Sequence, residues 1–576
     1  MKTLLKLLSC LTICCALLSC HQEPDNSMLI NTIIALLPGE PIDRNNTVSV
    51  SNVVNLQIDK ENDFSDYEGK KAFMIVMNEN AGNWDTFKNI STVSDNSADS
   101  LFKSDNQYVH IPFNPPKVNY LMDDISEPLL SRNISKTENQ SELQIGDTRN
   151  FYASTANYRT NNEWAKDSVL KAIGNHCYIW FKEKEGINVT QDKLDTLART
   201  FDSIYEKETY IFGKNTLENQ PSNSIINITD EDIKINIIVY DLFNDLETTK
   251  VEKSGTFGYF YTLDFQNSTE TKVTDEDGNV LYTLNSNRCQ CLHIDSYFLE
   301  IATEAQQSTI AHEFQHLLHY VNKSLKYGLL TSSNGNKYFR TSDTWFNEMM
   351  SMVCEDIMQS QLGIQDKDSP KSRLSIFNAA HYKGFEKWRD NNDVFISYAN
   401  AYAFGAYLLR NYGIDFIKTL ATNNYINEDA ITRALIAVNA RERSFKEALD
   451  LFYNVVLNPK GTYYTLNQAV SKTYTIAGNS VTFNCDAINL FDYLTIPKDD
   501  VNLEIAGSFY QASKYNDYYG PVILNNRIYK QLDGYGMFVS YMGIVGEDFN
   551  KNFKLTKKQI GDSGDTNIKY KLAFIN

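Results

Sequence analysis

Residues that break regular structure are scarce in this sequence. Its 576 residues include only 26 Gly and 12 Pro, while 42% are hydrophobic and 22% are charged. Collagen-like repeats and extensive intrinsic disorder are therefore excluded, and the chain has enough apolar residues to bury real cores. At about 100 to 200 residues per domain, the length predicts roughly three to five compact units rather than one small binding module.

Basic residues are fewer than acidic ones. The chain has 54 Lys and Arg against 72 Asp and Glu, which gives a formal net charge of -18. A surface with this excess of acid repels the phosphate backbone of nucleic acids. We therefore expect no nucleic-acid partner.

No apolar run is long enough to span a bilayer stably. The longest one, residues 4–18, follows Lys2 and precedes Ser19 and Cys20, which is the order of parts in a secretory signal peptide. We therefore predict that residues 1–19 are a signal peptide and that the protein is exported. The polar residues 20–48 then form a tether.

The end of this segment also indicates a lipid anchor. Residues 17–20, Leu-Leu-Ser-Cys, resemble the lipobox of bacterial lipoproteins, which implies cleavage before Cys20 and acylation of that residue. Several acyl chains anchor a protein stably, so we expect attachment to the bacterial cell envelope, at the outer membrane or cell surface. The alternative is an ordinary signal peptide that happens to contain cysteine, because other cysteines occur in the same stretch.

Hydrophobic patterns predict a multidomain α+β protein. Alternating residues with breakers between them indicate a small β domain and linker at 49–150, and alternation returns in a β domain at 461–576. Between them, residues 151–460 begin with strands and a helix and become mostly helical from about residue 303.

The cysteines that follow the predicted signal peptide give no clear metal motif. Their number is odd, their spacing matches no zinc knuckle, and a Cys-x-Cys pair alone is a weak metal signal. We interpret them as structural residues and leave their pairing open. They are Cys177, Cys289, Cys291, Cys354 and Cys485.

Two histidines stand four residues apart in a stretch with a helical pattern. His312 and His316 therefore share one helix face, from which both imidazoles can reach one metal ion at about 2.0 to 2.1 Å. Glu313 projects about 100° further round the helix, where it can take a proton from metal-bound water. This His-Glu-x-x-His pattern predicts a zinc hydrolase site. The alternative is a pair of packed or solvated helix histidines that bind no metal.

Zinc needs a third protein ligand and an open position for water. His319 lies on the same helix face, but Glu348, in a second predicted helix, is the better candidate. A metzincin is excluded, because that motif requires Gly at position 319 and His at position 322, where this sequence has His319 and Asn322.

The segment AHEFQH (311–316), followed about thirty residues later by WFNExxS (345–351), resembles the gluzincins, and most closely the hyicolysin family. The resemblance covers residues 150–460. It implies Glu348 as third ligand of one catalytic Zn2+, in a thermolysin-like region with an upper mixed-sheet subdomain and a lower helical subdomain. Met352 stands where the family pattern has an Asp that orients a ligand histidine, so Glu355 or Asp356 would have to supply that carboxylate.

Two residues are candidates for the hydrogen-bond donor that stabilises the oxyanion. Tyr402 begins a Tyr-x-x-Gly-Ala segment that looks like the one in which aminopeptidase N relatives place their catalytic tyrosine, and His381 is our second choice. Residues 150–310 contain no match to the GxMEN segment with which those aminopeptidases bind the substrate amine. We therefore expect an endopeptidase.

The predicted activity is hydrolysis of peptide bonds in extracellular or periplasmic proteins by zinc-bound water, with Glu313 as general base. We expect the strand at 257–261 to pair with an extended protein or peptide substrate, and residues 21–150 could shield the cleft. The main alternative is an adhesin-like lipoprotein with a structural or inactive zinc site. Hydrolysis of non-peptide amides or esters is a third possibility. The oligomeric state stays open.

Overall fold

The computed structural model describes the chain from residue 53 onward, with gaps. The predicted signal peptide, Cys20 and the tether lie outside the described residues. Within them, no helix has the length and apolar character needed to cross a membrane. The described residues are 53–82, 117–122, 143–154, 161–220, 225–252, 255–267, 271–274, 280–331, 337–389, 394–456, 466, 468–493, 521, 532–556 and 568–575.

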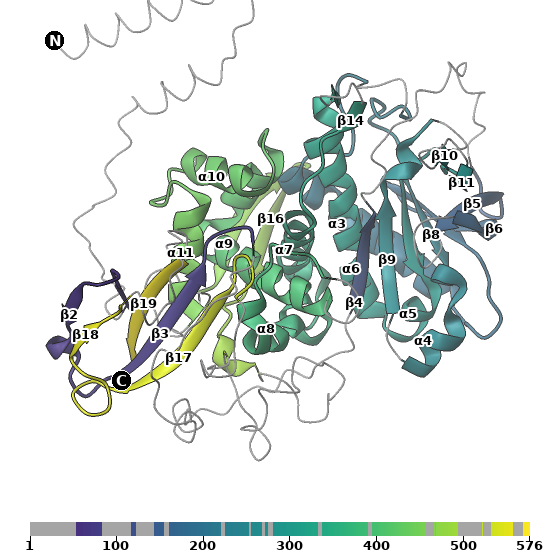
Figure 1. The fold of residues 1–576 in the computed structure, drawn as a ribbon. Helices are drawn as coiled ribbons and strands as arrows, with labels where there is room; N and C mark the ends of the chain where they lie inside the picture. The colour runs from purple at the N-terminus through teal and green to yellow at the C-terminus, as the bar shows by residue number, and fades with distance from the viewer. Residues whose placement is uncertain are drawn as a thin grey trace, which may run out of the picture. The chain divides into compact units, whose positions relative to one another are not determined.

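A mixed sheet of seven strands supports the predicted site (Figure 1). Three of its neighbouring pairs are parallel (β4 with β9, β12 with β8, and β8 with β7), and the other three are antiparallel. In spatial order the strands are β4 (Lys117–Met122), β9 (Gly255–Tyr261), β12 (Cys291–Asp295), β8 (Ile235–Tyr240), β7 (Cys177–Phe181), β6 (Asn161–Ile173) and β5 (Thr148–Ser154).

The two faces of this sheet bury different cores, because side chains alternate along each strand. On β12, Leu292 and Ile294 pack into the main core, which also contains Phe314 of helix α6 (Thr303–His319). Cys291, which precedes Leu292, belongs to a second core on the opposite face, together with Tyr259. Strand β12 therefore presents one set of residues to the helices and another set away from them.

The region from residue 303 is mostly helical, as its pattern predicts. Helix α6 packs against α7 (Thr344–Leu362), and α7 packs against α9 (Val394–Thr422). The other α-helices of the described residues are α3 (Gln191–Phe212), α4 (Leu246–Glu252), α5 (Ser296–Ile301), α8 (Leu374–Ala380), α10 (Asn427–Ala437) and α11 (Phe445–Val456).

Strands from both ends of the described chain form a second, antiparallel sheet. Its order is β1 (Val53–Asn55), β19 (Ile568–Ile575), β3 (Lys71–Asn78) and β17 (Met537–Ile544), so the purple β3 lies between the yellow strands β19 and β17 (Figure 1). We expected separate N- and C-terminal β domains. The alternating pattern reveals strands but not their partners, and here the partners lie at the other end of the sequence.

Four further two-stranded pairings are present among the described residues. The pairs are β2 (Glu61–Asp63) with β18 (Asn552–Lys554), β10 (Thr271–Thr274) with β11 (Val280–Leu284), β13 (Leu329–Thr331) with β14 (Lys337–Phe339), and β15 (Val470–Ile476) with β16 (Asn479–Cys485); residues 225 and 266 form an isolated bridge.

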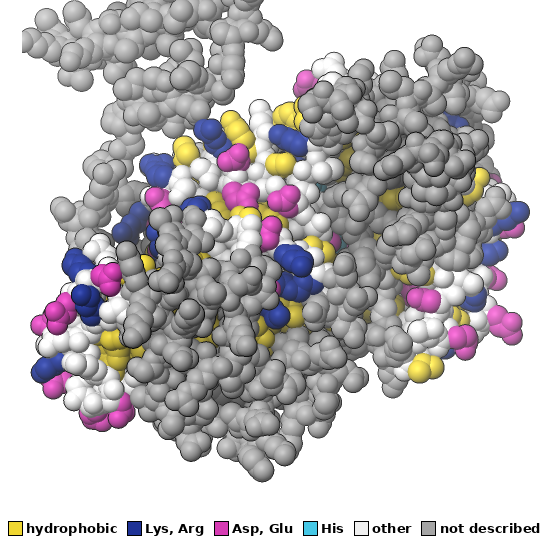
Figure 2. Space-filling model, in the orientation of Figure 1, with side chains coloured by type: hydrophobic (Ala, Val, Ile, Leu, Met, Phe, Trp, Pro, Cys, Tyr) yellow, Lys and Arg dark blue, Asp and Glu magenta, His cyan; other side chains and the backbone are white. Residues whose placement is uncertain are grey.

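The described surface on the face shown in Figure 2 carries acidic and basic side chains interspersed with apolar ones.

Candidate metal centre

Helices α6 and α7 bring the three predicted metal ligands together. The nearest ligand atoms of His312, His316 and Glu348 all lie within 4.8 Å of one another. Nε2 of His312 lies 3.1 Å from Oε2 of Glu348, and Nε2 of His316 lies 3.6 Å from the same oxygen. All three side chains are buried. Two imidazole nitrogens are thus directed at one carboxylate oxygen.

The second nitrogen of His312 is held by a carboxylate from α7. Nδ1 of His312 lies 2.7 Å from Oε1 of Glu355, and the Ser308 hydroxyl donates to the other oxygen of Glu355. Burial lowers the pKa of His312, but the hydrogen bonds with Glu348 and Glu355 outweigh it and raise that pKa to about 9. The surroundings of this imidazole therefore favour positive charge.

The second nitrogen of His316 is held by neutral groups. Its Nδ1 lies 2.9 Å from the Ser351 hydroxyl oxygen and 3.1 Å from Oδ1 of Asn347. Since the Ser351 hydroxyl donates to Gln315, its oxygen accepts from Nδ1 of His316. The Asn and Ser of the WFNExxS segment thus orient a histidine on the neighbouring helix, a role that we did not assign to them from the sequence.

This arrangement fits a zinc ion. If both histidines donate from Nδ1, their Nε2 lone pairs face the Glu348 carboxylate, and two sets of lone pairs at this distance require a cation between them. Burial raises the pKa of Glu348, but His316 and His312 outweigh it and lower that pKa, so this carboxylate stays ionised. Two imidazole nitrogens and one carboxylate oxygen are the three protein ligands typical of an open zinc site.

Glu313 lies beside this group, on the side of α6 that meets β9. Its side chain is fully buried. A Cβ atom at Gly258 of β9 would lie 3.2 Å from Cγ of Glu313 and 2.9 Å from Cγ2 of Thr309. The glycine therefore allows the strand to approach α6 at the position of the predicted base.

The expected substrate-pairing edge is not open in this structure. Strand β9 pairs with β12 on one side and with β4 on the other, in parallel. We expected residues 257–261 to offer a free edge to substrate, and this is wrong for the structure described, because β4 occupies that edge. Strand β4 itself comes from the region 21–150, which we expected to shield the cleft.

The two remaining α7 and α9 candidates belong to a different cluster. Asp356 forms an ion pair with Arg410, at 2.6 Å between Oδ2 and Nη1. The Tyr402 hydroxyl donates to the same Oδ2 at 3.0 Å, and all three side chains are buried. Glu355 rather than Asp356 therefore contacts a predicted ligand. The geometry also disagrees with Tyr402 as oxyanion donor, because its proton is directed to Asp356.

His381 is directed to the second sheet. Its Nδ1 lies 2.9 Å from the carbonyl oxygen of Met537, at the start of β17. The imidazole is buried and its ring lies near those of Phe377 and Tyr382. Packing against the second sheet thus accounts for this contact of His381.

Sequence reasoning missed a buried cation near the site. Arg373 is only 5% exposed, and its guanidinium lies 4.6 Å from the ring centroid of Tyr398. The charges of Glu355 and Glu348 act on it and favour its protonated form, while burial lowers its pKa. No spacing in the sequence links position 373 to α6 and α7, since their proximity depends on tertiary packing.

Comparison with known proteins agrees with this geometry. Residues 166–459 match the family described as Peptidase M30, and the chain belongs to that family. It is also similar to Neutral metalloprotease ShpI of Staphylococcus hyicus, with 28% identity over 292 residues. That stretch covers 47% of this chain and 54% of the relative, so the chain spans about half of the relative's length. The resemblance to a metallopeptidase family is confirmed.

Proposed function

We propose that this protein is a zinc-dependent endopeptidase with His312, His316 and Glu348 as the metal ligands. The observation that carries the proposal is the convergence of two imidazole Nε2 atoms on one Glu348 oxygen, with Glu313 buried beside them. Family membership and the name of the metalloprotease relative support the same activity.

When bound, zinc supplies Lewis acidity, which acidifies a water molecule and polarises a carbonyl group. Glu313 accepts the proton of the attacking water and then gives it to the leaving amine. Because Glu313 neighbours His312 in sequence but points elsewhere round the helix, it can act on water without binding the metal.

Other side chains prepare the ligands. Glu355 accepts from Nδ1 of His312, which fixes the tautomer that leaves Nε2 available to metal. Arg373 supplies a positive charge that opposes the buried carboxylates near it. Arg373 and a divalent cation together carry three positive charges. These balance the three negative charges of the buried carboxylates Glu313, Glu348 and Glu355.

We further propose that the protein acts on extracellular or periplasmic proteins and is held to the envelope through a lipid on Cys20. The signal-peptide pattern before Cys20 supports export. A thermolysin-like layout, with the seven-stranded sheet above and α6, α7 and α9 below, is also a proposal, supported by the order of sheet and helices along the chain.

The test uses protein that begins after Cys20, with casein as an unfolded substrate. We expect the parent to cleave casein and a metal chelator to stop it. A Glu313→Gln variant should lose at least about 100-fold in rate, because general-base catalysis contributes that much or more, and should keep its zinc. Glu304→Gln is the matched control, an exposed glutamate on the same helix.

Two results would contradict the proposal. Casein cleavage by Glu313→Gln at the parental rate would show that Glu313 is not the general base. Absence of zinc from the parent protein after purification in zinc-containing buffer would remove the metal site.

A further inference from the structure

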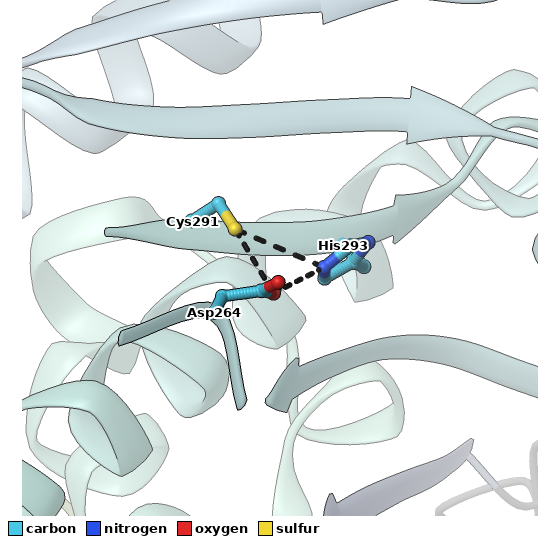
Figure 3. A group of neighbouring side chains, drawn as sticks. All are labelled: Asp264, Cys291 and His293. Atoms are coloured by element: carbon cyan, nitrogen blue, oxygen red, sulfur yellow. Dashed lines mark hydrogen bonds and ion pairs between the residues drawn. The ribbon is translucent and has the colours of Figure 1, made fainter. Parts of the chain in front are cut away.

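A second group of metal-binding side chains lies on the other face of the seven-stranded sheet. It contains Asp264, in the 3-10 turn after β9, together with Cys291 and His293 of β12 (Figure 3). Oδ2 of Asp264 lies 3.1 Å from Sγ of Cys291 and 3.0 Å from Nε2 of His293, and Sγ and Nε2 are 3.9 Å apart. Each residue is at most 1% exposed.

The arrangement is not that of a Cys-His-Asp nucleophile. In a catalytic triad the nucleophile and the carboxylate contact opposite nitrogens of the imidazole. Here Cys291 and Asp264 both face Nε2 of His293, while Nδ1 lies 3.1 Å from the Tyr240 hydroxyl. Sulfur, nitrogen and oxygen therefore converge on one point, which is how ligands surround a metal ion.

A fourth candidate ligand lies next to these three. Cys289 is buried, its side chain interacts with that of Cys291, and its backbone N–H donates to the Asp264 carbonyl at 3.0 Å. Cys289 lies in a bend two residues before β12, and its sulfur stands outside the three ligand atoms that lie within 4.8 Å of one another.

We propose that Asp264, Cys291 and His293 hold a structural transition-metal ion of the Zn2+ type, and that the Cys289 side chain turns toward the ion as its fourth ligand. Tetrahedral bonds of about 2.0 to 2.3 Å place ligand atoms about 3.3 to 3.8 Å apart, close to the separations among Asp264, Cys291 and His293. Four protein ligands leave no open position for substrate, so this ion has a structural role.

The surroundings match a metal site in charge and in orientation. Two thiolates and one carboxylate carry three negative charges, and a divalent ion together with Arg149 balances them. Arg149 donates to Sγ of Cys289 at 3.5 Å and to the Asn287 carbonyl at 2.9 Å. The Tyr240 hydroxyl, 2.7 Å from that of Tyr259, holds the second nitrogen of the ligand histidine.

The ion would join parts of the sheet that are distant in sequence. It would tie the turn after β9 to β12, and Arg149 would extend the link to the edge strand β5. Strand β12 leads through α5 into α6, which carries His312 and His316. The second site therefore lies under the strand that positions the first, on the opposite face of the sheet.

Cobalt substitution tests this site separately from the first. The ligands His312, His316 and Glu348 contain no sulfur, so thiolate-to-cobalt charge-transfer absorption in the near ultraviolet reports only the proposed second site. Protein that begins after Cys20 is loaded with Co2+ and its absorption is recorded. We expect the absorption in the parent and in Glu348→Gln, and its loss in Cys291→Ser.

The matched control is Cys485→Ser, which removes another buried free cysteine and should keep the absorption. If Cys291→Ser does not fold, Cys289→Ser is the second variant, and it should weaken the absorption. Absence of the absorption from the folded parent would overturn the proposal, and so would an intact mass that shows a disulfide between Cys289 and Cys291. Since proteolysis is not the readout, failure of the peptidase proposal would leave this test unaffected.

Discussion

The two buried groups on opposite faces of the seven-stranded sheet differ in how far the sequence reveals them. His312 and His316 stand one helical turn apart on α6, and this spacing alone predicts a shared metal. In the second group, Cys291 and His293 are two residues apart on a strand, but Asp264 lies 27 residues before Cys291. Only the pairing of β9 with β12 brings Asp264 there.

The two groups also differ in what surrounds them. In the first group, His312 is anchored at Nδ1 by a carboxylate, Glu355, and a further carboxylate, Glu313, lies beside the ligands without joining them. The histidine of the second group is anchored by the neutral Tyr240 hydroxyl. The comparison teaches that an additional acid next to an open ligand set indicates chemistry, whereas a closed ligand set indicates a structural role.

Removal of a metal ligand from the first group should have the largest effect, on both casein cleavage and zinc content. A His312→Ala variant removes one nitrogen ligand, so we expect casein cleavage to disappear and zinc content to fall from about two ions per chain to about one. Metal analysis of the folded variant beside a casein assay checks this. Retention of two ions would show that His312 binds no metal.

The anchors of the two histidines should differ in their effect on metal binding. Glu355→Gln keeps an acceptor for Nδ1 of His312 but removes a charge, and should weaken zinc binding at the first site by about 10 to 100-fold. Tyr240→Phe, its counterpart at the second site, removes a neutral partner and should have a smaller effect there. Competition with a chromophoric chelator measures both, and a larger effect of Tyr240→Phe would reverse our interpretation.

A Tyr402 variant tests whether this buried tyrosine stabilises the fold or takes part in catalysis. Burial raises the pKa of its hydroxyl well above the usual range, so it stays a donor to Asp356. Tyr402→Phe leaves that carboxylate with one partner fewer, and we expect stability to fall by about 1 to 3 kcal/mol with kcat nearly unchanged. Denaturant unfolding and casein kinetics measure the two quantities. A large loss of kcat at unchanged stability would restore Tyr402 as the oxyanion donor.

A dependence of stability on pH is expected from Asp295, which ends β12 and caps α5 by accepting from the Phe298 and Leu242 N–H groups, each at 3.0 Å. Burial raises its pKa from 3.8 to about 8. Between these values the folded chain keeps a proton that the unfolded chain has lost, so stability should fall as pH rises, by at most about 1.4 kcal/mol per pH unit.

An Asp295→Asn variant does not titrate and should lose this slope. Melting temperatures of parent and variant between pH 5 and pH 8 provide the measurement. Parallel curves over that interval would show that Asp295 is ionised throughout.

Local patterns predicted much of this molecule, and long-range contacts limited the rest. The HExxH helix, Glu348 on a second helix and the strand at residues 257–261 follow from short-range spacing and are present in the structure. The partner of Tyr402 and the nearby charge of Arg373 depend on how α7, α8 and α9 pack. A single sequence contains no periodic signal for either.

The same limit explains the strand errors. Strand β3 is present as expected, yet its partners β17 and β19 lie more than 450 residues further along the chain. Likewise, residues 257–261 form a strand, but the segment that covers its edge, β4, comes from a region that the sequence assigned to a linker.

Anomalous diffraction at the zinc absorption edge, from crystals of protein that begins after Cys20, tests the central claim most directly. Our account predicts a zinc peak bounded by Nε2 of His312, Nε2 of His316 and the Glu348 carboxylate. It also predicts a second peak between Asp264, Cys291 and His293. A map without a peak between α6 and α7, from zinc-loaded crystals, would contradict the claim that this chain is a zinc peptidase.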